Sequence, residues 1–381
     1  MKPRVVILTD IIAPYRIPVF NALARREELD LHVIFLCETD KRLRQWRVYT
    51  EEIRFPYQVL SSWWLRAGAK KLLLHRGLAR ALRKLDPDAI ICGGYNYIAF
   101  WQALAWSRRH GVEFILWSES NGRDARVGRP WVEALKSNFL KRCDRFVVPG
   151  KASFDYLQLL GSPETKIATA PNAVDNNFFA AQGAKVRAAA PEFRQKLNLP
   201  DRFILFVGRL VPEKGVFDLL EAYAKLESSL RSEIALVFAG DGISRNELKL
   251  PADQINPGNI IFTGFLHRED LPAFYALAEV LVLPTHSDPW GLVVNEAMAC
   301  GLPIIVTDVA GCSDDLVRDG WNGYVIPVRD PDKLSIAIDA VVRCPQKRQE
   351  MSERSFQRIQ NFSPEACAAG LASAGLGREL Q

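Results

Sequence analysis

The sequence lacks the features that mark membrane-spanning, secreted and metal-binding proteins. No run of 18 apolar residues occurs in its 381 residues, and the apolar run that follows residue 4 is too short for a secretion signal. The seven cysteines are scattered without paired spacing, which fits reduced thiols and argues against disulfides. The five histidines do not cluster with them. We therefore expect a cytoplasmic protein with no metal site.

Acidic residues are scarce in the first half of the chain. Residues 1–175 contain 28 Lys and Arg against 18 Asp and Glu, a net charge of +10, whereas the remaining residues carry a net charge of −5. No motif of a nucleic-acid reader accompanies the basic half, so nucleic acid is not expected as a partner.

Short apolar runs alternate with amphipathic stretches along the whole chain. Its length and its 48% hydrophobic composition suffice for two domains, each with a core. The alternation predicts an α/β protein with parallel sheets covered by helices on both faces. The expected strands are residues 5–8, 31–35, 89–92, 113–118, 145–148, 203–207, 234–239, 259–263, 280–283, 303–307 and 323–326. We expect a boundary near Asp175, which gives domains at 1–175 and 176–362.

Residues 285–303 place a carboxylate on either side of a glycine. A helix is expected to begin near Gly291, and its unpaired N–H groups and positive dipole end would attract a phosphate. Asp288 precedes this helix, and Glu296 lies more than one turn inside it, where a carboxylate can accept hydrogen bonds from paired sugar hydroxyls. Alternatively, Asp288 is only a helix N-terminal acid and Glu296 an exposed helical residue.

Gly208, Arg209 and Lys214 follow the expected strand at 203–207. Two cations between a buried strand and a helix are well placed to neutralise a diphosphate, Arg209 as a planar fork and Lys214 as a point charge. The alternative is a solvated loop in which Lys214 pairs with Glu213.

Two further turns follow expected strands. Gly240 and Asp241 come after one of them, and Phe265 and Leu266 lie in the turn after the next. Open α/β sheets bind ligands at the carboxyl ends of their strands. Glycine in such a place is also ordinary turn chemistry.

These four turns, in this order and spacing, resemble those of the retaining glycosyltransferases of family 4. That family has the GT-B fold, in which two Rossmann-like, doubly wound domains face a central cleft. The resemblance is strongest over residues 200–330. Residues 170–175 are similar to the family's segment between the domains, and 311–317 and 319–327 match its closing helix and strand. The resemblance further implies that a last helix, about residues 363–381, packs back onto the first domain.

The resemblance implies a donor site for a nucleotide diphosphate sugar in the second domain. It assigns the diphosphate to Arg209 and Lys214, the ribose hydroxyls to Glu296, and the transferred sugar to Asp288, where the family usually has Glu. Asp is one methylene shorter, so the reach to the sugar must differ. The expected donor-binding residues are Gly208, Arg209, Lys214, Gly240, Asp241, Phe265, Leu266, Asp288, Gly291, Leu292 and Glu296. No cofactor is implied, and UDP- or GDP-sugar is the expected donor.

The first domain departs more from the family. Tyr15 and Arg16 follow the first strand, where the acceptor or the donor sugar would pass, and they are the expected acceptor-binding residues, although the neighbouring prolines also fit a simple helix entry. After the strand at 113–118, Glu119 stands where many members have a His near the reaction centre. Glu119 would orient the acceptor, or accept its proton if burial raised its pKa. The alternative is a loop Glu that pairs with Arg123 or Arg126.

The densest basic stretch runs from Trp63 to Leu85 and contains no acidic residue. The recurrence of leucine at 74, 78, 82 and 85 predicts a helix with a core-facing side, which leaves its arginines on another face. With Trp63 and Trp64 at one end, the segment would suit an anionic membrane surface. An ordinary solvated helix fits equally well.

The sequence thus predicts a metal-independent retaining glycosyltransferase with Asp288, Arg209, Lys214 and Glu119 as catalytic residues. It would transfer a hexose-type sugar to a hydroxyl of a glycan or lipid-linked acceptor, as in cell-envelope polysaccharide or glycolipid synthesis. A sugar-nucleotide epimerase of the same fold is one alternative. A noncatalytic nucleotide-sugar-binding protein, which would show no turnover, is the other.

Overall fold

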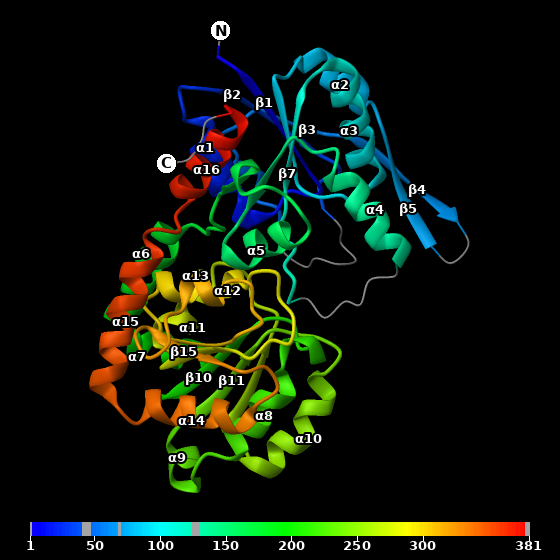
Figure 1. The fold of residues 1–381 in the computed structure, drawn as a ribbon. Helices are drawn as coiled ribbons and strands as arrows, with labels where there is room; N and C mark the ends of the chain where they lie inside the picture. The colour runs from blue at the N-terminus through cyan, green and yellow to red at the C-terminus, as the bar shows by residue number, and fades with distance from the viewer. Residues whose placement is uncertain (1, 40–46, 68–69, 124–129, 378–381) are drawn as a thin grey trace. The chain divides into compact units, whose positions relative to one another are not determined.

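The computed structural model describes residues 2–39, 47–67, 70–123 and 130–377 (Figure 1). These residues form two compact units. Unit 1 contains the described residues of Met1–Asn121, Arg126–Val174 and Pro364–Gln381, and unit 2 contains those of Gly122–Ala125 and Asp175–Ser363.

Unit 1 is built on a seven-stranded parallel sheet with the order β3-β2-β1-β6-β7-β8-β9. Its strands are β1 (Arg4–Thr9), β2 (Asp30–Phe35), β3 (Tyr57–Val59), β6 (Ala89–Cys92), β7 (Glu113–Trp117), β8 (Arg145–Val148) and β9 (Ile167–Thr169). Its helices are α1 (Ile17–Ala24), α2 (Leu78–Leu85), α3 (Ile98–His110), α4 (Pro130–Leu140), α5 (Lys151–Leu159) and α16 (Pro364–Gly375), with 3-10 turns η1 (Pro14–Arg16), η2 (Thr50–Glu52) and η3 (Glu164–Lys166).

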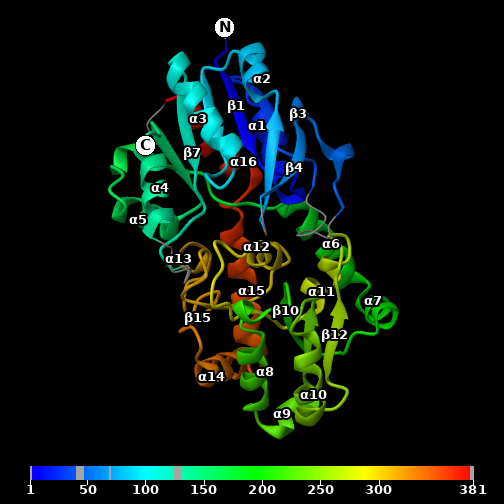
Figure 2. The ribbon, with the colours of Figure 1, turned by 90° about the vertical axis from the view of Figure 1, so that its right-hand side faces the viewer.

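Successive side chains of β1 enter cores on opposite faces of this sheet. Val5 and Ile7 pack into one cluster with residues of α1 and α16, whereas Val6 and Leu8 pack into a second with residues of α2, α3, α4 and α5. A strand covered on both faces is apolar throughout, which explains why the segment lacks polar alternation. Figures 1 and 2 show the carboxyl-terminal helix α16 beside α1, although the two are far apart in sequence.

A separate antiparallel hairpin, β4 (Ser61–Ala67) and β5 (Lys70–Arg76), contacts α3 through β5 (Figure 1). The prediction of a helix from the leucine spacing is therefore wrong for the residues before Leu78. Leu74 is paired with Trp63 across the hairpin, and α2 begins only at Leu78, after Gly77 with a φ of 89°. Leu78 and Leu82 are buried, as the spacing predicts.

Unit 2 has a six-stranded parallel sheet with the order β12-β11-β10-β13-β14-β15. Its strands are β10 (Phe203–Val207), β11 (Ala235–Ala239), β12 (Ile260–Gly264), β13 (Val280–Leu283), β14 (Ile304–Thr307) and β15 (Gly323–Ile326). Its helices are α6 (Asn176–Ala188), α7 (Ala190–Leu197), α8 (Val216–Ala224), α9 (Ser228–Glu233), α10 (Arg245–Ile255), α11 (Leu271–Leu277), α12 (Leu292–Ala299), α13 (Ser313–Leu316), α14 (Pro331–Val342) and α15 (Pro345–Ile359), with a 3-10 turn η4 (Pro212–Lys214).

Helices also cover this second sheet. Ile204 and Phe206 of β10 pack with residues of α8, α9, α10 and α14, while α6, α11 and α12 pack against one another. All eleven expected strands are present, with ends that differ by at most one residue. The expected α/β fold with two parallel sheets is thus confirmed. Among the described residues, no helix combines the length and apolar character that crossing a bilayer requires.

Candidate functional site

The strand order of unit 2 reverses between β10 and β13. The chain after β10 continues to one side of the sheet, through β11 and β12, and then returns to the other side at β13. The loops after two such strands diverge and leave a crevice at the carboxyl edge, which is where open α/β sheets bind ligands. Here the two loops are 208–215 and 284–291.

Backbone contacts hold these two loops together. Gly215 has a φ of 66°, and a Cβ built on it would lie 1.8 Å from the carbonyl oxygen of Pro284, so only glycine fits. The backbone N–H of His286 donates to the carbonyl oxygen of Glu213 at 2.8 Å. The His286 ring nitrogen Nε2 also lies 2.8 Å from Oδ2 of Asp218 in α8. The loops therefore form one structural piece.

Lys214 and Asp288 meet between the two loops. The Lys214 ammonium forms an ion pair with Oδ2 of Asp288, and the side chains are only 15% and 16% exposed. The other carboxylate oxygen of Asp288, Oδ1, accepts a hydrogen bond from the backbone N–H of Trp290 at 3.2 Å. Lys214 thus pairs with Asp288 and not with Glu213, the partner in the alternative interpretation of this loop.

Helix α12 begins immediately beyond this pair. Its N-cap is Gly291, which has a φ of 97°, and Leu292 is its first residue. A Cβ built on Gly291 would lie 2.8 Å from Cδ2 of Leu283 and 3.9 Å from Cγ of Asp288. The unpaired N–H groups of the first turn therefore open beside Asp288 and Lys214, and they add a second source of positive potential.

Glu296 lies on α12, where Oε2 accepts a hydrogen bond from the Tyr275 hydroxyl at 2.6 Å. Burial raises the pKa of Glu296 to about 7, against the opposing effects of the Tyr275 hydrogen bond and the charge of Arg268. Tyr275 belongs to α11 and is fully buried. Sequence reasoning missed Tyr275, because nothing in its own segment marks it as a partner of α12.

The remaining donor-site candidates lie in neighbouring loops of the same edge. A Cβ built on Gly240 would lie 1.9 Å from the carbonyl oxygen of Gly208, so these two turns are in close backbone contact. Asp241 is exposed, with Arg245 3.4 Å away. Arg209 is exposed too.

The turn after β12 carries the last two of these candidates. Phe265 is 41% exposed and packs edge-on against the ring of His267, and Leu266 is partly buried.

In unit 1, the candidates form a cluster at the carboxyl ends of β1 and β7. The Arg16 guanidinium donates to Oε1 of Glu119 at 2.8 Å, and its carbon lies 3.9 Å from the Trp117 ring centroid. It also lies 5.6 Å from the ring of Tyr15. Burial alone lowers the pKa of Arg16, but Glu119, Tyr15 and Asp10 together raise it above its ordinary value.

The alternative partners of Glu119 behave differently. Arg123 instead forms an ion pair of 2.5 Å with Asp314, and Arg126 lies outside the described residues.

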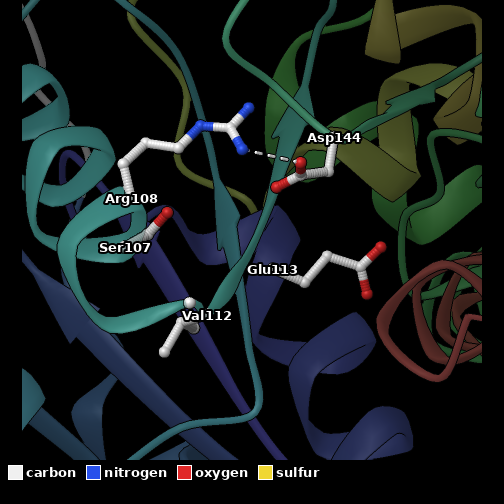
Figure 3. Close-up of a pocket in the computed structure, with 6 residues that line it drawn as sticks. Ser107, Arg108, Val112, Glu113 and Asp144 are labelled. Carbon is white, nitrogen blue, oxygen red and sulfur yellow. Dashed lines mark hydrogen bonds and ion pairs between the residues drawn. The ribbon is translucent and has the colours of Figure 1, made fainter.

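A hollow on unit 1 is lined by Ser107, Arg108, Gly111, Val112, Glu113 and Asp144 (Figure 3). Arg108 and Asp144 point toward each other and form an ion pair of 3.0 Å, while the Glu113 carboxylate points away from them. These residues lie at the amino end of β7 and just before β8. The hollow is therefore at the edge of the sheet opposite to Arg16 and Glu119.

Across residues 2–39, 47–67, 70–123 and 130–377, no three His, Cys, Asp or Glu side chains are grouped so as to hold a metal ion.

Comparison with solved structures gives the class of the fold. HepE of Anabaena in complex with UDP superimposes with a TM-score of 0.76 over 99% of this chain and 100% of that one, at 18% identity. The same protein with UDP-glucose gives a TM-score of 0.74 at 17% identity, over 98% of this chain and 99% of that one. Together with the two parallel-sheet units, these matches define a GT-B protein.

Two protein-family models match the chain. The model "Glycosyl transferases group 1" matches residues 190–358, and "Glycosyltransferase Family 4" matches residues 20–178. The chain belongs to this family of group 1, family 4 glycosyltransferases.

Among curated relatives, alpha-D-kanosaminyltransferase of Streptomyces kanamyceticus is 33% identical over 199 residues, 52% of this chain and about half, 51%, of that enzyme. D-inositol 3-phosphate glycosyltransferase of Frankia alni is 28% identical over 298 residues, 71% of this chain and 69% of that enzyme.

Proposed function

We propose that the protein is a retaining glycosyltransferase that transfers a hexose-type sugar from a UDP- or GDP-sugar to a hydroxyl group. The observation that carries the proposal is the meeting of Lys214, Asp288 and the start of α12 at the strand-order reversal of unit 2. Family membership and the UDP-bound structural neighbour support it.

The donor diphosphate would bind between the amino end of α12 and the two cations of the loop after β10. Lys214 is already held at this place by Asp288, and its ammonium has three N–H donors, so it can contact a phosphate while keeping the carboxylate. Arg209 is exposed at the same loop and free to swing toward a second phosphate oxygen. The Asp288 carboxylate would accept hydrogen bonds from the transferred sugar.

The reaction requires the site to stabilise negative charge on the leaving group. As the glycosidic bond to the diphosphate breaks, negative charge grows on the departing oxygen, and fixed positive groups stabilise it more than they stabilise the bound donor. One such donor contributes about 3–4 kcal/mol in other enzymes. With two cations and a helix terminus in this role, we propose that transfer needs neither a metal ion nor any cofactor beyond the donor, and that it survives EDTA.

The other end of the donor would bind at Glu296. A carboxylate inside α12 can accept hydrogen bonds from both ribose hydroxyls, and Tyr275 fixes its orientation through Oε2. The exposed ring of Phe265, with Leu266, would contact the base.

Lys214→Ala tests the proposal most directly. We expect kcat/KM for transfer to fall about 100-fold or more, because a preorganised charge at the leaving group is lost. Lys225→Ala is the matched control, since Lys225 also pairs with carboxylates of unit 2 but is an exposed residue that caps the carboxyl end of α8. Thermal-shift screening with UDP-, GDP-, ADP- and dTDP-sugars identifies the donor, and NMR of the product shows whether the anomeric configuration is retained. Equal activity of the Lys214→Ala and wild-type proteins would refute the assignment.

We further propose that the acceptor is a glycan or lipid-linked molecule used at the inner face of a membrane. Trp63 is 37% exposed, and Arg76 stacks on its ring at 4.6 Å, beside the exposed Arg80 and Arg83 of α2. An aromatic and basic surface of this kind suits the headgroup region of an anionic bilayer.

Vesicle sedimentation at low salt tests the membrane contact. Changing Arg76, Arg80 and Arg83 to Gln should weaken binding to phosphatidylserine vesicles roughly 100-fold, at about 1 kcal/mol for each basic side chain. Neutral phosphatidylcholine vesicles are the control. If the wild-type protein stays in the supernatant with anionic vesicles, the membrane proposal is wrong.

A further inference from the structure

The three side chains of the cluster formed by Arg16, Trp117 and Glu119 differ in their exposure to solvent. Trp117 is 3% exposed and the Arg16 side chain 12%, and the guanidinium carbon lies 3.9 Å from the centroid of the indole ring. Glu119 is 32% exposed. A ligand that approaches this edge of the sheet therefore meets the carboxylate and not the guanidinium.

The charges of the cluster do not cancel. Arg16 is paired with Glu119, and Asp10, the first residue after β1, also contributes to the field at the Arg16 guanidinium. One cation thus faces two carboxylates. The groups that raise the pKa of Arg16 include both carboxylates, although the unit as a whole is basic by sequence.

We infer that Glu119 binds the acceptor by accepting hydrogen bonds from its hydroxyls and that Arg16 is a positioning residue that acts through Glu119. The inference rests on the proposed transferase function and specifies its acceptor, which is a polyhydroxylated ring without phosphate or carboxylate near the reacting hydroxyl. Any anionic group of a lipid-linked acceptor would lie away from this cluster.

The chemistry of the Arg16–Glu119 pair favours an acceptor without phosphate or carboxylate. Oε1 of Glu119 is engaged by Arg16, and the lone pairs of Oε2 can accept hydrogen bonds from sugar hydroxyls. An ionised carboxylate cannot donate a hydrogen bond, so it cannot satisfy a phosphate or carboxylate oxygen and instead repels it. The stacked and paired guanidinium holds Glu119 in one orientation, which a free glutamate on a loop would not keep.

In this assignment Glu119 contacts the acceptor and Arg16 does not, whereas the sequence alone placed Arg16 where a sugar would pass and Glu119 where many family members have a histidine. A carboxylate stabilised by a guanidinium at 2.8 Å is a hydrogen-bond acceptor that orients a hydroxyl. The guanidinium of Arg16 is always charged, and it is already engaged in contacts with Glu119 and Trp117.

Paired acceptors test the inference on the full-length protein. The panel contains neutral monosaccharides, disaccharides and alkyl glycosides, each beside its 6-phosphate or uronic-acid counterpart. Wild-type protein should use the neutral member of each pair about tenfold better or more, because like charges in contact are strongly disfavoured. Glu119→Gln should lower kcat/KM for the neutral acceptors about 10- to 100-fold, the range for losing a hydrogen bond to a charged group.

Variants of Arg16 test its role as a positioning residue. Because Arg16 acts through Glu119, the double variant Arg16→Gln, Glu119→Gln should be no worse than Glu119→Gln alone. Arg16→Lys, which keeps the charge but not the planar stack, should recover part of the loss of Arg16→Gln.

The outcomes separate this inference from the proposed function. A wild-type protein that prefers the phosphorylated or carboxylated acceptors, or uses no neutral one, overturns the inference. So does a Glu119→Gln variant that changes donor KM alone, or a double variant whose losses are additive. Failure of both UDP-sugars and GDP-sugars to bind at all would instead overturn the proposed transferase function.

Discussion

Glu296 shows how one buried contact sets a pH dependence. Its carboxyl has a pKa of about 7 because it is buried on α12, and the Tyr275 hydrogen bond restrains that rise. A hydroxyl of the ribose donates its hydrogen, so it binds the ionised form of Glu296 and lowers its pKa on binding. Below pH 7, the carboxyl must therefore lose a proton when the donor binds.

We expect donor affinity to rise as the pH increases from 6 to 8 and to level off above that range. The sign follows from the raised pKa, since the carboxyl is largely protonated at pH 6 and ionised at pH 8. Titration calorimetry with a sugar nucleotide in two buffers of different ionisation enthalpy should detect proton release at pH 6 and none at pH 8.5.

Two variants serve as controls for this prediction. Glu296→Gln should bind the donor more weakly at pH 8 and lose the pH dependence. Tyr275→Phe should shift the midpoint upward, because the hydroxyl normally lowers the pKa of Glu296. A Glu296→Gln protein that keeps the wild-type pH profile would show that another group titrates.

At the scale of elements, the donor loops are fixed by backbone packing as much as by side chains. Gly215→Ala should destabilise unit 2 by about 4 kcal/mol or more, because its Cβ would overlap the carbonyl of Pro284 at 1.8 Å. Gly320→Ala is the matched control: its φ of 68° is nearly the same as the 66° of Gly215, but its Cβ would meet nothing within 4 Å. The control should cost only about 1–2 kcal/mol of backbone strain.

Chemical denaturation followed by circular dichroism gives both free energies of unfolding. Equal losses for the two variants would mean that the loop after β10 moves away from Pro284 at little cost.

The sequence predicted every strand of four or more residues in the two parallel sheets and missed the shorter strands and the hairpin. Continuous apolar runs such as 203–207 can only be buried, so their strands were found within one residue. β3 and β9 have three residues each, with partly exposed side chains, and carry no such signal. The hairpin β4–β5 was missed because Leu74 falls by chance in register with the leucines of α2.

The candidate site divides in the same way. Gly208, Gly215 and Gly291 mark turns whose chemistry is local, so their positions after strands could be predicted from the sequence. The contact of Glu296 with Tyr275, and that of Arg16 with Glu119, depend on which helices and strands become neighbours. Residues separated by 103 positions, as Arg16 and Glu119 are, give no periodic signal.

At the scale of the whole molecule, each unit has its own sheet with its own reversal of strand order, at β1/β6 and at β10/β13. The chain does not divide simply into two consecutive halves. Helix α16 follows unit 2 in the sequence but belongs to unit 1. Gly370 permits this return: a Cβ there would lie 2.2 Å from the carbonyl oxygen of Thr169 at the end of β9. The core of unit 1 therefore depends on the last described helix of the chain.

Leu371→Ala tests that dependence. Leu371 is fully buried in the cluster that contains Val5 and Ile7, so truncation should cost unit 1 about 2–5 kcal/mol. Leu159→Ala, at a position 82% exposed on α5 of the same unit, should change stability by no more than about 0.5 kcal/mol. Hydrogen exchange resolves the two units, and we expect faster exchange at the amides of β1 and unchanged exchange at those of β10. Equal acceleration in both strands would show that the units unfold together, and that α16 stabilises the whole chain and not unit 1 alone.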